Sequence, residues 1–351
     1  MAGSVGIKEV AQQAGVSVGT VSNVINRPEN VSEQTRVRVL AVIERLGYVR
    51  SESARQLRAG QSRIISLLVL DMANPFFVDV ASGAERAARE AGLWVMLCNS
   101  AQSPGEEAGY LSLFAEQRVR GVLVTPVDGS GRELADFRRR GTPVVFVDRA
   151  QPSEEGCSVS VDDVMGGGLA VRHLLEQGHR DIAYISGPMR LTQCQDRYTG
   201  ALGMIERWGL PRSRLRHIET GGLEDTAGRD AEAGRDAAAR LLGMSPRPTA
   251  VFCANDLLAL GVLQVLYGAG VSVPEEIALV GYDDIEFASA AAVPLTSVRQ
   301  PAQRMGRIAA ELLMEETGDA ARHHRHQQIV LRPELVVRGS SVSGGPKERG
   351  M

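Results

Sequence analysis

Apolar residues near the start of the chain recur with the spacing of short amphipathic helices. Four of them stand at positions i, i+3, i+4 and i+7: Ile7, Val10, Ala11 and Ala14. Gly15 predicts the end of this helix, and Ser17 predicts the N-cap of a second one. The apolar face of the second helix is formed by Val21, Val24 and Ile25.

A third helix is predicted beyond the turn-forming segment RPEN. It begins after Ser32 and ends near Gly47, and its inward-facing residues are Val39, Ile43 and Leu46. Three short helices with a glycine turn between the first two are typical of a helix-turn-helix, whose second helix lies in the DNA major groove. An ordinary three-helix bundle with a polar face is the alternative.

From residue 63 onward the pattern changes to apolar runs of strand length that alternate with helical stretches. The runs are RIISLLVLD, LWVMLCNS, GVLVTPVD, TPVVFVDR, DIAYISGP, TAVFCAND and IALVGYDD. Continuous apolar runs are expected of strands buried on both faces, and their alternation with helices predicts doubly wound parallel sheets. The fold class is therefore a small all-α helix-turn-helix domain followed by an α/β body.

Polar residues close six of these runs: Asp71, Thr125, Asp148, Ser186, Asn255 and Asp283. Ligands of open α/β sheets bind beyond the carboxyl ends of the strands. One polar residue at such a position is ordinary loop chemistry, whereas six predict a polar pocket.

Charge divides the chain as the helical and strand patterns do. Residues 1–63 carry nine Lys and Arg against five Asp and Glu, a net charge of +4. Because the whole chain has a net charge of −3, the remainder carries −7. A basic head on an acidic body is consistent with a nucleic-acid-binding module joined to something else. No apolar run reaches membrane-spanning length and no hydrophobic signal segment is found at the N-terminus, so we expect a soluble, cytoplasmic protein.

The remaining candidate chemistry predicts neither catalysis nor a cofactor. The four cysteines form no C-x-x-C pair and are expected to be reduced thiols. His323, His324 and His326 are predicted to lie in a polar loop without other ligands, so no metal site is predicted. The segment MGGGLA lacks the dinucleotide-binding spacing and predicts close helix packing instead, and no nucleophile elbow, Walker A loop or H-E-x-x-H motif occurs.

The segment IKEVAQQAGVSVGTVSNVIN, with the following VSEQTRVRVLAVIERLGYVRSESARQLRAG, resembles the N-terminal domain of the lac repressor/galactose repressor (LacI/GalR) family. The motifs DMANPFF, VDR, RYTGAL, FCANDLLALG, VGYDDIEFA and PLTSVRQP extend the resemblance to about Arg338. Gly6 departs from it, because the family usually has a capping threonine there, and glycine is a weaker N-cap.

This resemblance implies that Val18, Gly19 and Asn23 read bases. Val18 offers apolar contact to a thymine methyl, Gly19 lets the backbone approach the groove wall, and Asn23 can pair with adenine through two hydrogen bonds. Four small polar residues suit phosphate contacts, which position the helix without specifying sequence: Ser17, Thr20, Ser22 and Asn26.

The polar segment between residues 51 and 62 is a plain linker by composition. The resemblance implies instead a hinge helix that orders on DNA and inserts Leu57 between base steps of the minor groove. Ala54 would let two hinge helices touch, and Arg55 would lie near phosphates.

The resemblance also implies a two-lobed effector domain, similar to bacterial sugar-binding proteins. The implied effector residues are Asp71, Asn74, Phe76, Asp148, Arg149, Gln193, Arg197, Asn255 and Asp283. Paired acceptors and fixed donors suit sugar hydroxyls, and a phenyl ring suits an apolar sugar face, so a sugar is the favoured effector. Each of these residues could instead form a structural ion pair or a cap.

The predicted organisation is a DNA-binding domain (1–50), a hinge (51–62), an effector domain (63–339) and a flexible tail (340–351). The lobes are expected to comprise about residues 63–161 with 298–323, and 162–297 with 324–339. A sequence-specific repressor that binds a palindromic operator as a homodimer is the predicted function. A solute-binding protein would need an export signal, and a sugar-handling enzyme would need a catalytic base or phosphate loop.

Overall fold

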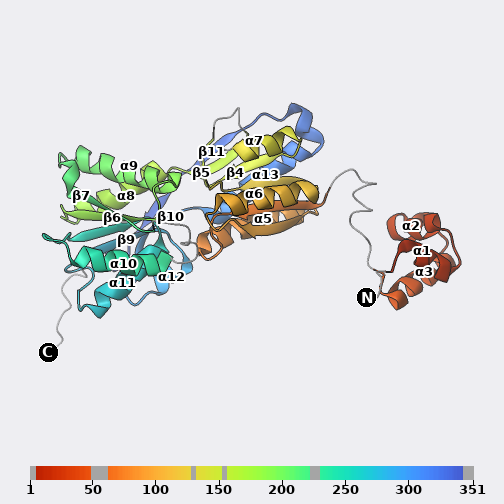
Figure 1. Ribbon diagram of the computed structural model, residues 1–351, viewed down its shortest axis with the longest axis horizontal. Coiled ribbons are helices and arrows are strands. Elements are labelled where there is room, and N and C mark those ends of the chain that lie inside the picture. Colours follow the sequence, from red (N-terminus) through yellow and green to blue (C-terminus); the bar gives the residue numbers. More distant parts are fainter. Residues whose placement is uncertain (1–4, 49–61, 128–131, 152–155, 222–229, 343–351) are drawn as a thin grey trace. The chain divides into compact units, whose positions relative to one another are not determined.

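The computed structural model describes residues 5–48, 62–127, 132–151, 156–221 and 230–342. The chain divides into two units between Ser62 and Arg63, where the sequence predicts the start of the body. Figure 1 shows both units, and each is described by itself below.

The N-terminal unit contains three α-helices within residues 5–48: α1 (Ile7–Ala14), α2 (Val18–Asn26) and α3 (Glu33–Leu46), with a short 3-10 turn η1 (Pro28–Asn30). Gly15 ends α1 in the left-handed conformation, at φ 64°, and the Val16 amide donates to the Ala11 carbonyl. The Ser17 hydroxyl caps α2 by accepting from the Thr20 amide at 3.0 Å. A small core lies between the helices: Val10, Ala11, Ala14, Val21, Val24, Val39 and Val42.

The first lobe of the body is built on a parallel sheet with the strand order β11-β5-β4-β3-β1-β2. Its strands are β1 (Ile64–Val69), β2 (Trp94–Asn99), β3 (Gly121–Val124), β4 (Val144–Val147), β5 (Ser158–Val161) and β11 (Gln328–Leu331). The helices are α5 (Pro75–Glu90), α6 (Pro104–Glu116), α7 (Arg132–Arg139) and α13 (Ala302–Thr317), followed by η4 (Asp319–His323). Leu67 packs with α5 and α13, whereas Leu68 packs with α6 and α7, so neighbouring residues of β1 supply two cores.

The second lobe repeats this plan, with the strand order β12-β10-β9-β8-β6-β7. Its strands are β6 (Ile182–Ser186), β7 (Leu215–Glu219), β8 (Ala250–Cys253), β9 (Ala278–Asp283), β10 (Thr296–Arg299) and the antiparallel β12 (Glu334–Val336). The helices are α8 (Asp163–Glu176), α9 (Thr192–Arg207), α10 (Asp230–Leu242), α11 (Asp256–Gly268) and α12 (Glu286–Ala290), with η3 (Arg212–Arg214). Figure 1 shows them arranged around the second sheet.

The predicted division of the C-terminal part between the lobes is wrong at two boundaries. β10 pairs with β9 up to Arg299, so residues 298 and 299 belong to the second lobe. β11 pairs with β5, which assigns residues 328–331 to the first lobe. A short apolar run predicts a strand, but the sheet edge that it meets decides which lobe it joins.

The predicted flexible tail begins too early. Ser340 and Ser341 are buried, and the Ser340 hydroxyl donates to the Leu279 carbonyl at 2.6 Å. The Ser341 hydroxyl lies 2.7 Å from His173 Nε2 and 2.6 Å from the Thr296 hydroxyl. These contacts fasten the chain to β9, β10 and α8 as far as residue 341.

The glycine-rich start of α8 packs closely against its neighbours, as the sequence predicts. A Cβ atom on Gly167 would lie 2.0 Å from the Arg197 carbonyl oxygen in α9, and one on Gly166 would lie 2.1 Å from the Tyr282 hydroxyl. Only glycine fits at either position. Among the described helices, none has the length and apolar character needed to cross a membrane.

Candidate functional site

The N-terminal unit presents an exposed, small and mostly polar face on α2. Val18, Gly19 and Asn23 are exposed there, while Val21 and Val24 on the opposite face are buried. No hydrogen bond joins the Asn23 side chain to another residue within residues 5–48, so its amide is free to meet a partner.

The four residues expected at phosphates lie beside this face and bond to one another in pairs. The Ser17 and Thr20 hydroxyls are 2.9 Å apart. Asn26 Nδ2 donates to the Ser22 carbonyl at 2.7 Å and lies 3.2 Å from the Ser22 hydroxyl. These bonds hold short polar groups at the start and end of α2.

Glycine at position 19 is not required by the fold. A Cβ atom there would meet only the Ser17 hydroxyl, at 3.5 Å, which is an ordinary contact. Glycine inside a helix costs about 1 kcal/mol relative to alanine. Packing within the described part of the unit therefore does not require glycine at this position.

The predicted hinge residues Ala54, Arg55 and Leu57 lie outside the described residues.

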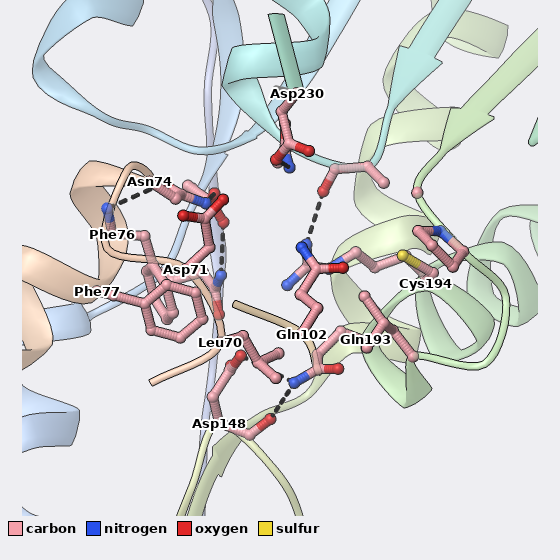
Figure 2. A pocket seen from close by; sticks show the side chains of 18 residues that line it. Leu70, Asp71, Asn74, Phe76, Phe77, Gln102, Asp148, Gln193, Cys194 and Asp230 are labelled. Atoms are coloured by element: carbon pink, nitrogen blue, oxygen red, sulfur yellow. Dashed lines mark hydrogen bonds between the residues drawn. The ribbon is translucent and has the colours of Figure 1, made fainter. Parts of the chain in front are cut away.

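The body contains a cavity between its two lobes, beyond the carboxyl ends of β1, β4 and β9. Eight of the nine predicted effector residues line it: Asp71, Asn74, Phe76, Asp148, Gln193, Arg197, Asn255 and Asp283. Figure 2 shows Asp230 above the cavity, Asp148 below it, and Asp71 with Phe76 and Phe77 on one side. Residues far apart in the sequence thus meet at the carboxyl ends of the strands, where the sequence predicts the pocket. Their contact with an effector stays a prediction.

Three of the polar residues singled out along the sequence do not line this cavity. Arg149 lies near Asp196, where its charge partly offsets the rise in the pKa of that carboxyl caused chiefly by burial. Thr125 is buried, and the Ser186 hydroxyl lies 2.8 Å from His217 Nε2.

Asp283 joins the lobes at one side of the cavity. Its Oδ2 accepts from Asn74 Nδ2 at 3.0 Å, and its Oδ1 accepts from Gln300 Nε2 at 2.7 Å. Burial raises the pKa of Asp283 above its ordinary value, and the Arg197 guanidinium partly offsets that rise. Two fixed donors therefore hold the carboxylate in place.

Asp148 joins the lobes at the other side. Gln193 Nε2 donates both to the Asp148 carbonyl oxygen, at 2.9 Å, and to Oδ2, at 3.0 Å. Burial and the nearby charge of Asp163 raise the pKa of Asp148 well above its ordinary value. Oδ1 of this carboxyl is buried and has no partner within the described chain.

Both of these aspartates have a backbone conformation that is uncommon outside glycine. The φ angles are 58° at Asp148 and 105° at Asp283. Residues held in such regions cost of the order of 1–3 kcal/mol and cluster at binding sites. Their strain is consistent with a functional pocket.

Arg197 is held by the second lobe itself. Its Nε donates to Asp163 Oδ1 at 2.7 Å, and its guanidinium carbon lies 3.7 Å from the centre of the Tyr282 ring. Nη1 donates to the Ala254 carbonyl at 2.6 Å. Among the described residues that line the cavity, Arg197 is the one cation, and it is already paired with Asp163.

Asn255 has both a capping and a pocket contact. Its Oδ1 accepts from the Leu258 amide at 2.8 Å, which caps α11, and its Nδ2 donates to Asp230 Oδ2 at 2.6 Å. Burial raises the pKa of Asp230 to about 6, and the bond from Asn255 limits that rise.

Three polar cavity residues, Gln102, Asp230 and Gln300, were not predicted. Gln300 immediately follows β10, so the strand-end signal that identifies Asp283 would have found it. Gln102 lies in the turn after β2. Asp230 is the first residue of α10, where an aspartate is expected equally well as part of a helix cap. Buried Oε1 atoms of Gln102 and Gln300 have no partner among the described residues.

The expectation that no other ligand lies near the histidines is wrong. Cys157 and Glu316 lie beside His324 and His326. They come from distant parts of the sequence, so only the folded chain brings them together.

Comparison with known proteins decides the family. Residues 6–51 match the family description "Bacterial regulatory proteins, lacI family", and residues 171–341 match "Periplasmic binding protein-like domain". The HTH-type transcriptional repressor PurR of Photobacterium profundum is 35% identical over 336 residues, 95% of this chain and 98% of that protein. The chain belongs to the lacI family. The resemblance and the fold class predicted from sequence are thereby confirmed.

Solved structures of transcriptional regulators share the whole architecture. The transcriptional regulator CelR in complex with cellobiose is 32% identical, with a TM-score of 0.70, over 96% of this chain and 99% of that one. The lac repressor dimer bound to operator and the anti-inducer ONPF is 25% identical, with a TM-score of 0.79, over 97% and 100%. This lacI-family chain is a DNA-binding transcriptional repressor regulated by an effector, and it is not an enzyme.

Proposed function

We propose that the effector is a neutral sugar bound between the two lobes. The observation that carries this proposal is a set of buried acceptor oxygens without partners: Asp148 Oδ1, Gln102 Oε1 and Gln300 Oε1, all from residues that line the cavity. A buried acceptor left unpaired costs about 1–3 kcal/mol. A ligand with several hydroxyl donors is the chemical complement of such a set of acceptors.

The charge around the cavity argues against an anionic ligand. Among the described residues, four carboxyl groups line it: Asp71, Asp148, Asp230 and Asp283. The guanidinium of Arg197 already faces Asp163. A phosphate or carboxylate would add negative charge where burial already disfavours it.

The aromatic side of the cavity completes the chemistry of a sugar site. Phe76 and Phe77 meet edge to face, with ring centres 5.0 Å apart. A ring face can cover the apolar face of a sugar while the aspartates accept from its hydroxyls. Cellobiose in the CelR structure, and ribose in an Enterococcus faecium lacI-family regulator 26% identical to this chain, support the same class of ligand.

At the N-terminal unit, we propose that α2 enters the major groove and that Val18, Gly19 and Asn23 meet base edges. The bonded pairs Ser17–Thr20 and Ser22–Asn26 would lie at phosphates. Leu57 would wedge into the minor groove beside Ala54 and Arg55. Two copies related by a two-fold axis would read a palindromic operator, so the proposed active form is a homodimer. The proposed location of this complex is the cytoplasm.

The decisive test combines operator binding with a ligand panel. Selection from a random duplex library identifies the operator, and sedimentation of the complex gives the number of chains bound. Calorimetry with neutral mono- and disaccharides, sugar phosphates, and free nucleobases then identifies the effector class. We expect a neutral sugar to bind and to change operator affinity; binding of nucleobases or sugar phosphates alone would overturn the sugar assignment.

A further inference from the structure

Four metal-binding side chains converge at the end of the first sheet that lies opposite the effector cavity. Cys157 immediately precedes β5, His324 and His326 precede β11, and Glu316 lies in the last turn of α13. The cavity lies beyond the carboxyl ends of the strands, whereas these residues lie at the amino ends of two parallel ones. The cluster is therefore separate from the effector site.

The spacing of the donor atoms is that of a four-coordinate metal site. Cys157 Sγ lies 3.1 Å from His324 Nε2 and 3.8 Å from His326 Nδ1. Glu316 Oε1 lies 3.2 Å from His326 Nδ1 and 3.6 Å from His324 Nε2. Zinc bonds of about 2.0–2.3 Å in a tetrahedron separate neighbouring ligand atoms by roughly 3.3–3.8 Å.

We propose that Cys157, Glu316, His324 and His326 bind one zinc ion. A thiolate, two imidazoles and a carboxylate are ligand types that zinc takes. Calcium and magnesium prefer oxygen ligands only, so this set does not suit them. All four donor atoms lie within 4.8 Å of one another. Four protein ligands close the coordination shell, so the ion has a structural role.

Neighbouring groups orient two of the ligands. Glu315 Oε2 lies 3.3 Å from His324 Nδ1, so the carboxylate stands behind the ring on the side away from Nε2, the nitrogen that faces Cys157. The Gln327 amide donates to Cys157 Sγ at 3.3 Å. A carboxylate behind a metal-binding histidine and an amide at the thiolate are the supporting contacts expected of such a site.

Burial differs among the ligands in a way that suits ion entry. The Cys157 side chain is buried, so its sulfur lies on the inner side of the cluster. His326 is 36% exposed and gives access from solvent. The bound ion would fasten the start of β11, an edge strand, to α13 and β5.

Cobalt substitution in the full chain tests this assignment. Chelator-treated protein titrated with Co²⁺ should bind one ion per chain and show tetrahedral ligand-field bands together with thiolate-to-cobalt charge transfer. Cys157→Ser should abolish the charge-transfer band, whereas His323→Ala, next to the cluster but outside it, should leave both spectra unchanged. A six-coordinate spectrum, or one unaffected by Cys157→Ser, would overturn the proposal.

Variants at exposed positions keep the test independent of folding. His326→Ala removes an exposed ligand, and Glu315→Gln removes the carboxylate behind His324. Loss of such an outer carboxylate lowers metal affinity about 10- to 100-fold, and loss of a ligand should lower it further. Glu311→Gln on the same helix, whose partner is Arg307, is the control. Zinc competition against a chromophoric chelator measures these ratios, and equal affinities in all variants contradict the assignment.

Discussion

Asn74 of the first lobe donates a hydrogen bond to Asp283 of the second, with 3.0 Å between Nδ2 and Oδ2. Gln193 and Asp148 form the matching link in the reverse direction, from the second lobe to the first. Both pairs line the effector cavity. An effector that bonds to either aspartate therefore acts on the same groups that hold the lobes together, which is how ligand binding can favour one lobe arrangement.

Replacement of Asp283 by alanine should lower effector affinity about 10- to 100-fold. The carboxylate is expected to accept charge-assisted bonds worth roughly 1.5–3 kcal/mol from effector hydroxyls. Operator affinity without effector should change little, because the hydrogen bonds of this carboxylate, among the residues that the structure describes, come from within the body. Calorimetry and operator titration measure the two affinities.

Asn74→Ser is the companion variant for this experiment, because it breaks the link between the lobes and leaves Asp283 in place. Serine keeps an oxygen that can cap α5, as Asn74 does through the Phe76 amide, but is too short to reach Asp283. If Asp283 contacts the effector, Asp283→Ala should weaken binding much more than Asn74→Ser. Because Asn74 is itself an expected effector residue, equal losses would show that Asp283 and Asn74 act as one unit, and that Asp283 makes no larger contact of its own.

Asp230→Asn should stabilise the protein in a pH-dependent manner. Because burial raises the folded-state pKa of Asp230 to about 6, the contribution of this carboxyl to stability is fully present below its ordinary pKa of about 4 and is lost as the pH rises through about 6. The variant lacks this loss. Its advantage in unfolding free energy should grow from pH 4 and level off above pH 6, at about 2–3 kcal/mol.

Thermal unfolding of both chains between pH 4 and pH 8 measures this advantage. Asp236→Asn on the same helix has the same change in charge at an exposed position, so its melting temperature should follow that of the unmodified chain at every pH. A constant offset for Asp230→Asn across the range would show that its carboxyl does not titrate as expected.

Asn23→Ala should relax operator preference at one base pair in each half-site. The loss of a two-bond contact to adenine removes about 1–3 kcal/mol of discrimination against the other bases. Asn26→Ala should instead weaken all operators alike, because a phosphate contact carries no sequence information. Binding measured against a set of single-base operator variants distinguishes them, and a uniform loss with Asn23→Ala would reassign that residue to the backbone.

Gly19→Ala should leave the N-terminal unit folded, and more stable by up to about 1 kcal/mol, because alanine is the better helix former. Among the described residues of the unit, the added methyl group meets only the Ser17 hydroxyl. Operator affinity should nevertheless fall, since the methyl group occupies space that the groove wall is expected to take. Circular dichroism and operator titration test both halves; unchanged operator affinity would remove Gly19 from the interface.

Much of the fold follows from local patterns in the chain. Gly15 and Ser17 mark the turn between α1 and α2 because a left-handed backbone and a hydroxyl cap act within one helical turn. Apolar runs mark the strands, and the polar residues that close them include Asp71, Asp148 and Asp283 of the cavity. Each of these signals depends on neighbours a few residues away, so the sequence alone determines them.

Contacts between distant segments were decided only by the tertiary structure. The run at residues 328–331 could join either sheet by its pattern alone, and in the folded chain it pairs with β5 of the first. Ser340 and Ser341 look like a polar tail until β9 and β10 supply partners for their hydroxyls. Cys157 lies 167 residues from His324, yet their donor atoms are 3.1 Å apart. No local pattern encodes such a distance, because it depends on the closure of the whole first lobe.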